Sequence, residues 1–527
     1  MPDKTAASGV PAKMKFSLNI LIVTIASVAC SLQATAQSTL LITERDAVMP
    51  GRLIYDAVCR SNAAAMVYRD SVSRSSMGLS FLYDTQSRPV LAQNGDGYRD
   101  FMVRADSYTR LGDKSVVWGD ASFTTGKMRN IRWADCIDYE RLAPYVLGDP
   151  AGGDLSTREY DFSGGYATHL GRWSVGVFGS YRAEIASRNR DPRLRAIVSD
   201  LNIEIGLTRR VSDSYVVGAK AALEIYRQNC DLDFYNPLND INTYPLTGLG
   251  TYYNRFSGNS NEAAGYQADG GRVGVQLLSR ELKGFNCYLV YGRERVQQRL
   301  RDYNNLTLAY LTHSSLGALV SYRFQINKSL RVAPVVSMDY DDRRGTENLF
   351  GTAIGSGYEV IGERDNYRLT RYRLSVGVPV EFTHGNSCLS VAPALTGTGV
   401  ECKVIDVDRR VCVRGLAPGL SAGYSGLMSG SVLLKAGLSA DYSMNRAPES
   451  RNNLLTQLSA IDDKDLAASV AGNYEMLKAD CLRLGAEIGV GKMISQVLYS
   501  ININYRYRRY ESPADCHRLD VTLSATF

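Results

Sequence analysis

The sequence predicts an all-β protein: a transmembrane, antiparallel, up-and-down β-barrel of roughly 16–20 strands, preceded by a short N-terminal non-barrel segment. Three observations indicate this class. Apolar and polar side chains alternate with a period of two along most of the chain, and short turns alternate with longer polar connections. The chain also ends in an aromatic residue, Phe527, on the apolar face of its last alternating segment.

The composition fits this class and argues against several others. Among 527 residues, 45% are hydrophobic and 22% are charged, which is too apolar for general disorder. Tyr is much commoner than Phe, with 33 residues against 13, as in strands that carry amphipathic ring anchors. After residue 36 no uninterrupted apolar run approaches the length of a membrane-spanning helix. The net charge of +6 is small for this length, so no nucleic-acid partner is predicted.

The N-terminus has the pattern of a secretion signal. Lys15 precedes an apolar core over residues 16–32, and residues 34–36 (Ala-Thr-Ala) supply the small-x-small pattern of a cleavage site. We therefore predict a signal peptide over residues 1–36. A lipoprotein anchored at Cys30 is the less favoured alternative, because the residue three positions before this cysteine is not bulky and apolar.

The cysteines and histidines give no sign of a metal site. Without Cys30, nine of the ten cysteines remain, and none forms a CxxC pair or a metal-ligand spacing. The four histidines lie far apart in the sequence. We predict no metal and no cofactor. Cys402 and Cys412 flank a predicted loop, and a disulfide that bridges this loop is one alternative, since the sequence does not give the geometry.

Residues 37–75 differ from the rest of the chain. They contain few β-branched residues in their second half, and the run 62–66 (Asn-Ala-Ala-Ala-Met) favours a helix. We predict a periplasmic segment that either forms a short helix or hatch in the barrel mouth, or docks as a tail on the periplasmic rim. Composition does not separate these two arrangements.

Alternating strands are predicted for residues 76–527. A strand places successive side chains on opposite faces, so each segment acquires an apolar and a polar side. The pattern is clearest at the C-terminus and in the segments 372–382 and 497–508. In the segment 497–508 the outward set is Val497, Tyr499, Ile501, Ile503, Tyr505 and Tyr507.

A barrel is favoured over a soluble β-sandwich for two further reasons. Many segments reach about 10–14 residues, which suits a tilted strand that crosses a bilayer. Their polar faces carry Arg, Glu and Asn more often than the thin core of a sandwich would tolerate. Tyrosines near strand ends are candidates for interfacial girdles, although ordinary strand tyrosine is an equal alternative for any one of them. They are Tyr160, Tyr166, Tyr215, Tyr226, Tyr505, Tyr507 and Tyr510.

The connections predict which ends of the strands face the periplasm. Tight hairpins rich in Gly, Asn, Asp and Ser are expected on the periplasmic side, and long polar loops are expected outside. The short turns are 111–114, 170–172, 211–214, 283–284, 326–329 and 384–386. The long loops are roughly 126–156, 228–268, 343–365 and 445–452.

Phe527 is the candidate assembly signal. A C-terminal aromatic residue on the outward face is similar to the terminal signature of Gram-negative outer-membrane barrels, which the barrel-assembly machinery reads. With its Arg- and Tyr-rich amphipathic strands, the mature chain resembles an uncharacterised family of Bacteroidota outer-membrane β-barrels in its overall pattern. This resemblance implies an outer-membrane location, with outer-membrane lipid and the assembly machinery as partners. It brings no substrate and no catalytic residues.

A pore or transport-related role for small solutes is the leading functional prediction. Its support is the set of charged residues expected to line the lumen, because opposed Arg and acidic side chains are typical of polar pores. The same charges could instead form salt bridges that close the lumen and leave a structural or surface-binding barrel. A channel for hydrophobic solutes with an N-terminal hatch is a variant of the first role. The candidate lumen-lining residues are Arg182, Glu184, Arg272, Arg323, Arg371, Arg373, Glu381, Arg506 and Arg508.

Two other roles are less favoured. His313 and Ser315 are faintly similar to the His-x-Ser of outer-membrane phospholipases, in which a serine is activated by a histidine on the same strand face. The apolar register turns both side chains toward the lumen, whereas a lipid-cleaving site must face the bilayer, so no enzyme is predicted. The loop 228–268, rich in Tyr, Asn and Gly, suits either a binding surface or an ordinary solvated hairpin end.

Overall fold

The computed structural model describes residues 36–527, except 237, 239–240, 259–261, 282, 355–356, 429–430 and 513. The predicted signal peptide over residues 1–36 therefore lies outside the described residues, apart from Ala36. None of the helices in the described part of the chain is long and apolar enough to cross a membrane.

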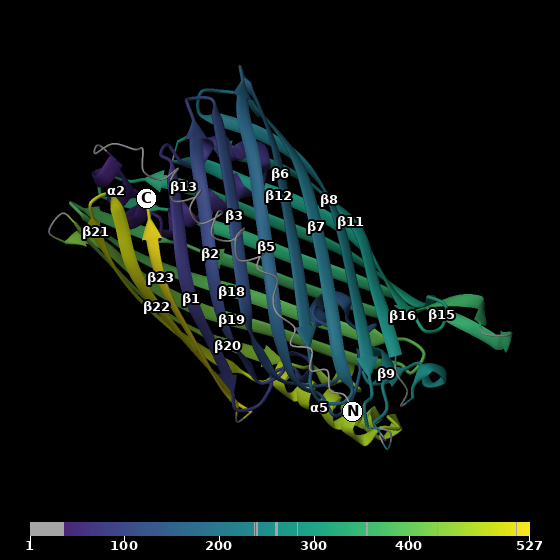
Figure 1. Cartoon of the computed structure of the whole chain (residues 1–527). Coiled ribbons are helices and arrows are strands. Elements are labelled where there is room, and N and C mark those ends of the chain that lie inside the picture. The colour runs from purple at the N-terminus through teal and green to yellow at the C-terminus, as the bar shows by residue number, and fades with distance from the viewer. Residues whose placement is uncertain are drawn as a thin grey trace, which may run out of the picture.

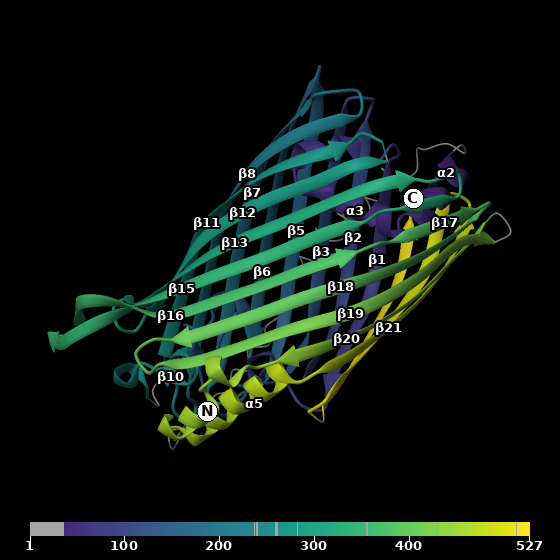
Figure 2. The same ribbon diagram turned by 180° about the vertical axis from the view of Figure 1, so that it is seen from behind.

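Antiparallel strands form a closed barrel (Figures 1 and 2). The sheet has 20 strand segments, and two of these, β14 (Leu330–Val332) and β17 (Val380–His384), are short continuations of neighbours interrupted at Pro334 and Pro379. Eighteen spanning strands therefore remain, which confirms the prediction of roughly 16–20. They are β1 (Arg74–Gln86), β2 (Gly97–Leu111), β3 (Ser115–Ile131), β5 (Gly153–Leu170), β6 (Trp173–Ser187), β7 (Arg193–Arg210), β8 (Tyr215–Asp233), β11 (Glu262–Ser279), β12 (Gly284–Leu300), β13 (Leu306–Gln325), β15 (Val335–Ile354), β16 (Gly357–Gly377), β18 (Ser387–Val404), β19 (Arg409–Met428), β20 (Val432–Arg446), β21 (Cys481–Ile494), β22 (Val497–Tyr510) and β23 (Ala514–Thr526).

The first and last strands close the ring. β1 pairs with β23 in an antiparallel register that runs from Ser76 opposite Thr526 to Gln86 opposite Cys516. Hydrocarbon offers no hydrogen bonds to an open sheet edge, so a spanning sheet must pair every strand on both sides. The closed register satisfies this requirement.

The outward face of the barrel is apolar, as the alternation predicts. Val376 and Ile501 point outward and are 45% and 42% exposed, whereas their neighbours Ser375 and Asn502 point inward and are partly buried. An apolar band around a closed barrel is stable only when lipid covers it, so the protein resides in the outer membrane.

The tyrosines divide between the two faces. Tyr160, Tyr166 and Tyr505 are exposed on the outward face, where a girdle requires them. Tyr226 is not a girdle residue but belongs to the other alternative: it is fully buried on the inward face and donates a hydrogen bond to the Asp138 carboxylate over 2.8 Å.

The turns follow the predicted asymmetry, with two corrections. The short turns connect successive strands at one end of the barrel, whereas the longest connections lie at the other end. Residues 343–365 are not a loop, because β15 and β16 remain paired there and project beyond the barrel as a hairpin (Figures 1 and 2). Arg343 and Glu347 on its inward face are buried, but near its tip the adjacent residues Val360 and Ile361 are both exposed, 45% and 67%. Water therefore meets both faces of the tip, where the alternation that marks the other strands is lost. The loop predicted over 445–452 is part of a longer connection, 447–480, which contains α5 (Lys464–Lys478).

The N-terminal segment lies inside the barrel at the end with the short turns. It consists of α2 (Ala36–Asp46), α3 (Pro50–Arg60) and the 3-10 helix η2 (Ala63–Tyr68), and we call residues 36–70 the hatch. η2 packs against β5, β6 and β7. Gly176 on β6 permits this close approach, since a Cβ there would lie 2.5 Å from the backbone of Ala63.

The opposite end of the barrel is filled by loops, which we call the cap. The cap comprises residues 132–152, the described residues of 234–261, and residues 447–480. Trp133, Leu142 and Phe256 from these loops are at most 2% exposed, and they pack against inward-facing apolar residues such as Leu155 and Leu194. Most aromatic residues of the Tyr-rich loop therefore belong to this core: Tyr244 and Phe256 are buried, and Tyr252 and Tyr253 pack against them. Tyr235 is the exception and is 65% exposed. α2 and α5 mark the hatch end and the cap end of the barrel in Figure 1.

Candidate functional site in the barrel lumen

A charged network ties the cap to the wall of the lumen. Arg182 on β6 bonds Asp138 of the cap over 2.5 Å and Glu184 on its own strand over 2.8 Å. Arg141, also from the cap, reaches across to Asp200 over 2.9 Å and to Glu294 over 2.7 Å. The cap thus places both an anionic and a cationic side chain in the lumen, and each pairs with side chains of opposite charge on the wall.

The network continues along β12, β13 and β15 through His313. Its Nδ1 lies 3.1 Å from Glu294, and its Nε2 contacts Asp341. Asp341 in turn accepts from Arg371 over 2.7 Å. The predicted inward orientation of His313 is confirmed by these contacts, and both of its ring nitrogens have carboxylate partners.

A second set of ion pairs holds the hatch. Arg323 and Glu381 form a buried pair over 3.1 Å, and Glu381 also accepts the backbone N–H of Gly51 at the start of α3 over 2.5 Å. Glu44 on α2 bridges Arg74 over 2.9 Å and Lys435 over 3.3 Å. The predicted lumen residues Arg323 and Glu381 are therefore attachment points for the hatch.

The other candidate residues also point inward but have different surroundings. Arg272 pairs with Glu224. Arg373 and Arg506 are exposed to the lumen and form no ion pair with any described residue, and Arg508 has none either. Phe527 lies outward as predicted, 41% exposed, and its backbone N–H donates to Ser75 over 2.9 Å, which joins the C-terminus to the start of β1.

One side of the lumen carries small side chains that face water. Ala394, Ser421 and Ser439 point inward from β18, β19 and β20, and all three are exposed. Inward residues can be exposed only where neither hatch nor cap covers them. The lumen therefore contains an aqueous space along β18–β22, opposite the wall that carries the cap network.

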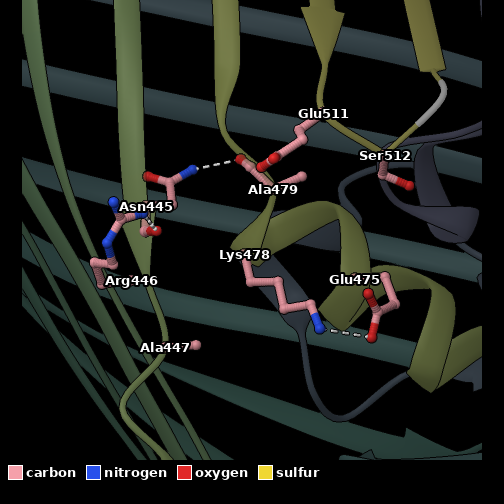
Figure 3. Close-up of a pocket in the computed structure, with 8 residues that line it drawn as sticks. All are labelled: Asn445, Arg446, Ala447, Glu475, Lys478, Ala479, Glu511 and Ser512. Carbon is pink, nitrogen blue, oxygen red and sulfur yellow. Dashed lines mark hydrogen bonds and ion pairs between the residues drawn. The ribbon is translucent and has the colours of Figure 1, made fainter.

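A pocket of about 410 Å³ opens at the cap end of this same side (Figure 3). It lies between α5 and the ends of β20, β21 and β22. Lys478 on α5 pairs with Glu475 over 2.9 Å, and Asn445 bonds the carbonyl oxygen of Ala479 over 2.6 Å. The remaining lining residues, Arg446, Ala447, Glu511 and Ser512, come from the strand ends.

The sequence comparisons assign the chain to a family. Residues 63–527 match the model of a family of unknown function, DUF6850, which spans the end of the hatch and the whole barrel. The chain belongs to the DUF6850 family. No functionally curated protein matches the sequence.

Solved outer-membrane proteins resemble this DUF6850 chain at low identity. A bacterial polysaccharide outer-membrane secretin is 11% identical with a TM-score of 0.36, and 86% of this chain and 98% of that one are covered. The unliganded ferric citrate transporter FecA is 10% identical with a TM-score of 0.40, and the coverage is 86% and 79%. A Pseudomonas aeruginosa FadL homologue is 12% identical with a TM-score of 0.36, and the coverage is 92% and 97%.

Sequence reasoning about this DUF6850 chain missed the cap residues of the network. Asp138 and Arg141 lie in a connection without alternation, and no local motif marks them as partners of Arg182 or Glu294. The disulfide considered between Cys402 and Cys412 is absent, because both are free thiols on the paired strands β18 and β19. Only the pairing of distant loops and strands brings the network together.

The cap has its own buried ionic anchor. Arg188, just after β6, contacts Asp135 over 3.1 Å and Asp149 over 2.6 Å, and all three residues are at most 3% exposed. One guanidinium cannot neutralise two buried carboxylates. Burial, together with the neighbouring Asp149, raises the pKa of Asp135 well above its ordinary range.

This anchor predicts a cap that loosens at alkaline pH. Because the pKa of Asp135 is raised by folding, its contribution to stability is complete below the unfolded-state pKa and is lost as pH rises through the folded value. We expect hydrogen exchange of residues 132–152 to accelerate as pH rises, after correction for intrinsic exchange. The variant Asp135→Asn should abolish this extra acceleration, whereas Asp154→Asn, at a partly exposed site, should retain it. Equal pH profiles for wild type and Asp135→Asn would contradict the assignment.

Proposed function

We propose that this barrel is a gated channel for small solutes in the outer membrane, with the hatch as its gate. The observation that carries the proposal is the aqueous side of the lumen, where Ala394, Ser421 and Ser439 face inward and are exposed. A barrel built only as a solid support would have no reason to keep inward-facing small residues in water. As part of the same proposal, we infer that the chain is related to the Bacteroidota outer-membrane barrels that its sequence pattern resembles.

Within the hatch, α2 has the attachment expected of a movable element. The polar contacts of α2 with the wall are few, chiefly Glu44 with Arg74 and Lys435. α3 and η2 are held more firmly: Ala63 donates its N–H to Glu204 over 2.8 Å, and Asn62 donates to the carbonyl oxygen of Ala219 over 3.0 Å. The apolar contacts of α2 are also few, with Leu40 and Leu41 packed on Leu433 and Leu498. Segments with few buried contacts open at low free-energy cost.

A closed structural barrel is the second candidate, and the cap network favours it. The cap core and the ion pairs of Arg141 and Arg182 occupy the part of the lumen opposite the aqueous side. In this alternative the charges serve cohesion and no solute crosses. The proposal assigns no catalysis to the chain, and the paired ring nitrogens of His313 support that choice.

Electrical recordings distinguish the two candidates. We expect wild-type protein in planar bilayers to be mostly closed, and a variant without residues 37–70 to show stable single-channel steps. Liposome swelling with neutral sugars of graded size should then report the width of the path. Heat-modifiable migration on gels checks that the variant barrel has formed. A correctly formed variant without conductance at any voltage would leave the closed structural barrel as the function.

A further inference from the structure

Four arginines form a contiguous block on the inner wall near the cap end. They are Arg483 on β21, Arg506 and Arg508 on β22, and Arg518 on β23, all on the inward face. Arg483 lies directly opposite Arg508, and Arg506 directly opposite Arg518. Like charges at directly opposed positions of neighbouring strands are destabilising. The sheet therefore carries a local repulsion that a structural role does not explain.

The block is only partly neutralised by protein carboxylates. Arg483 pairs with Asp441 over 2.5 Å, and Arg518 pairs with Asp520 over 3.1 Å. Asp84, opposite Arg518 on β1, is a third nearby carboxylate and is buried.

The two central guanidinium groups remain available. Within the described part of the chain, Arg506 and Arg508 form no ion pair, and Arg506 is exposed to the lumen. They lie two residues apart on one strand face, about 7 Å along the strand, so one small ligand can reach both.

A row of small residues leads away from Arg506 across the wall. Gly485 lies opposite Arg506, Ser439 opposite Gly485, and Ser421 opposite Ser439. The two serines are exposed, and a Cβ at Gly485 would collide with the Ser439 hydroxyl. The result is a row of small side chains on the inner wall, with hydroxyl donors along it and unpaired guanidinium groups at one end.

We propose that this part of the inner wall, the arginine block with its adjacent row of small residues, is an anion-binding site for a small solute that carries a phosphate or carboxylate group. The guanidinium groups of Arg506 and Arg508 bind the anionic group, since arginine donates paired, charge-assisted hydrogen bonds to both chemistries. The hydroxyls of Ser439 and Ser421 contact the rest of the solute. The bound anion offsets the repulsion within the block. The site and the rim pocket lie on the same strands, since Arg483 and Arg508 are only a few residues along the chain from Ala479 and Glu511.

Equilibrium binding tests the site without any assumption about transport. The full chain in detergent is titrated with inorganic phosphate and, separately, with citrate, against sodium chloride at matched ionic strength. We expect a rise in the thermal midpoint with phosphate or citrate beyond that with chloride. The double variant Arg506→Gln/Arg508→Gln should bind about tenfold more weakly or not at all. Arg509→Gln is the matched control, since Arg509 faces outward on the same strand.

The outcomes decide the proposal in either direction. Equal anion effects in wild type and the double variant, or equal shifts with chloride, would overturn it. The single variant Arg506→Gln replaces the double variant if that protein does not form a heat-modifiable barrel. A response to phosphate alone or citrate alone identifies which anionic group the site takes.

The role of this site in permeation rests on the proposed channel function and is tested separately. In the barrel without residues 37–70, a potassium chloride gradient should give a reversal potential that favours anions, and the double variant should lose most of this preference. If that barrel does not conduct, the channel function fails, while the binding titration still decides the anion site.

Discussion

Replacement of Glu381 by Ala should release the hatch. Arg323 would then remain buried without its partner, and Gly51 would lose the acceptor for its N–H. Loss of one member of a buried ion pair costs about 3–5 kcal/mol, because the remaining charge is neither solvated nor paired. We expect hydrogen exchange in α3 to accelerate by about 100-fold or more, and channel openings of the full-length protein to become frequent.

A double variant separates the lost charge pairing from the lost contact. Arg323→Met/Glu381→Gln removes the unpaired charge and keeps an oxygen that accepts from Gly51. Its hatch stability should return to within about 1 kcal/mol of wild type, since well-packed neutral replacements of buried ion pairs are often tolerated. If Glu381→Ala leaves α3 exchange unchanged, the Glu381 contact does not hold the hatch.

Arginine substitutions should distinguish the two faces of the strands. Arg in place of Val376 or Ile501 puts a charge on the lipid-facing surface, where both side chains are exposed to the surroundings of the barrel. We expect a loss of about 2–4 kcal/mol in folding free energy if these positions lie near the bilayer midplane. Reversible folding into lipid vesicles under urea measures this loss.

The neighbouring inward positions supply matched controls. Arg in place of Ser375 or Asn502 enters the lumen, so insertion should be close to wild type. Each pair compares adjacent residues on one strand at nearly the same depth. Equal losses on both faces would contradict the register of β16 and β22.

The alternation of side chains was enough to predict the strands and their orientation. Val376 and Ser375 face opposite sides as predicted, because a strand has a fixed period of two and each face meets a single solvent. The turn at 170–172 was equally predictable from the sequence, since a tight hairpin needs Gly or another residue that tolerates positive φ. Gly171 has a φ of 67°.

The same rule failed where the environment changed along a strand. Leu194 and Tyr226 are apolar or aromatic and face inward, because the cap covers the lumen wall at that end. A period of two shows that two faces differ, but it does not show which loop covers one of them. The projecting hairpin of β15 and β16 was missed for the converse reason, since water meets both faces of its tip, where Val360 and Ile361 are both exposed.

The sequence by itself determined a closed outer-membrane barrel with Arg182, Arg371 and Arg506 turned inward, because alternation, turn chemistry and strand length are local properties. Only the tertiary structure decided what those arginines do. Arg182 fastens the cap, Arg371 belongs to the His313 network, and Arg506 has no protein partner. Charge pairing depends on contacts between residues far apart in the chain, and no local pattern encodes such contacts.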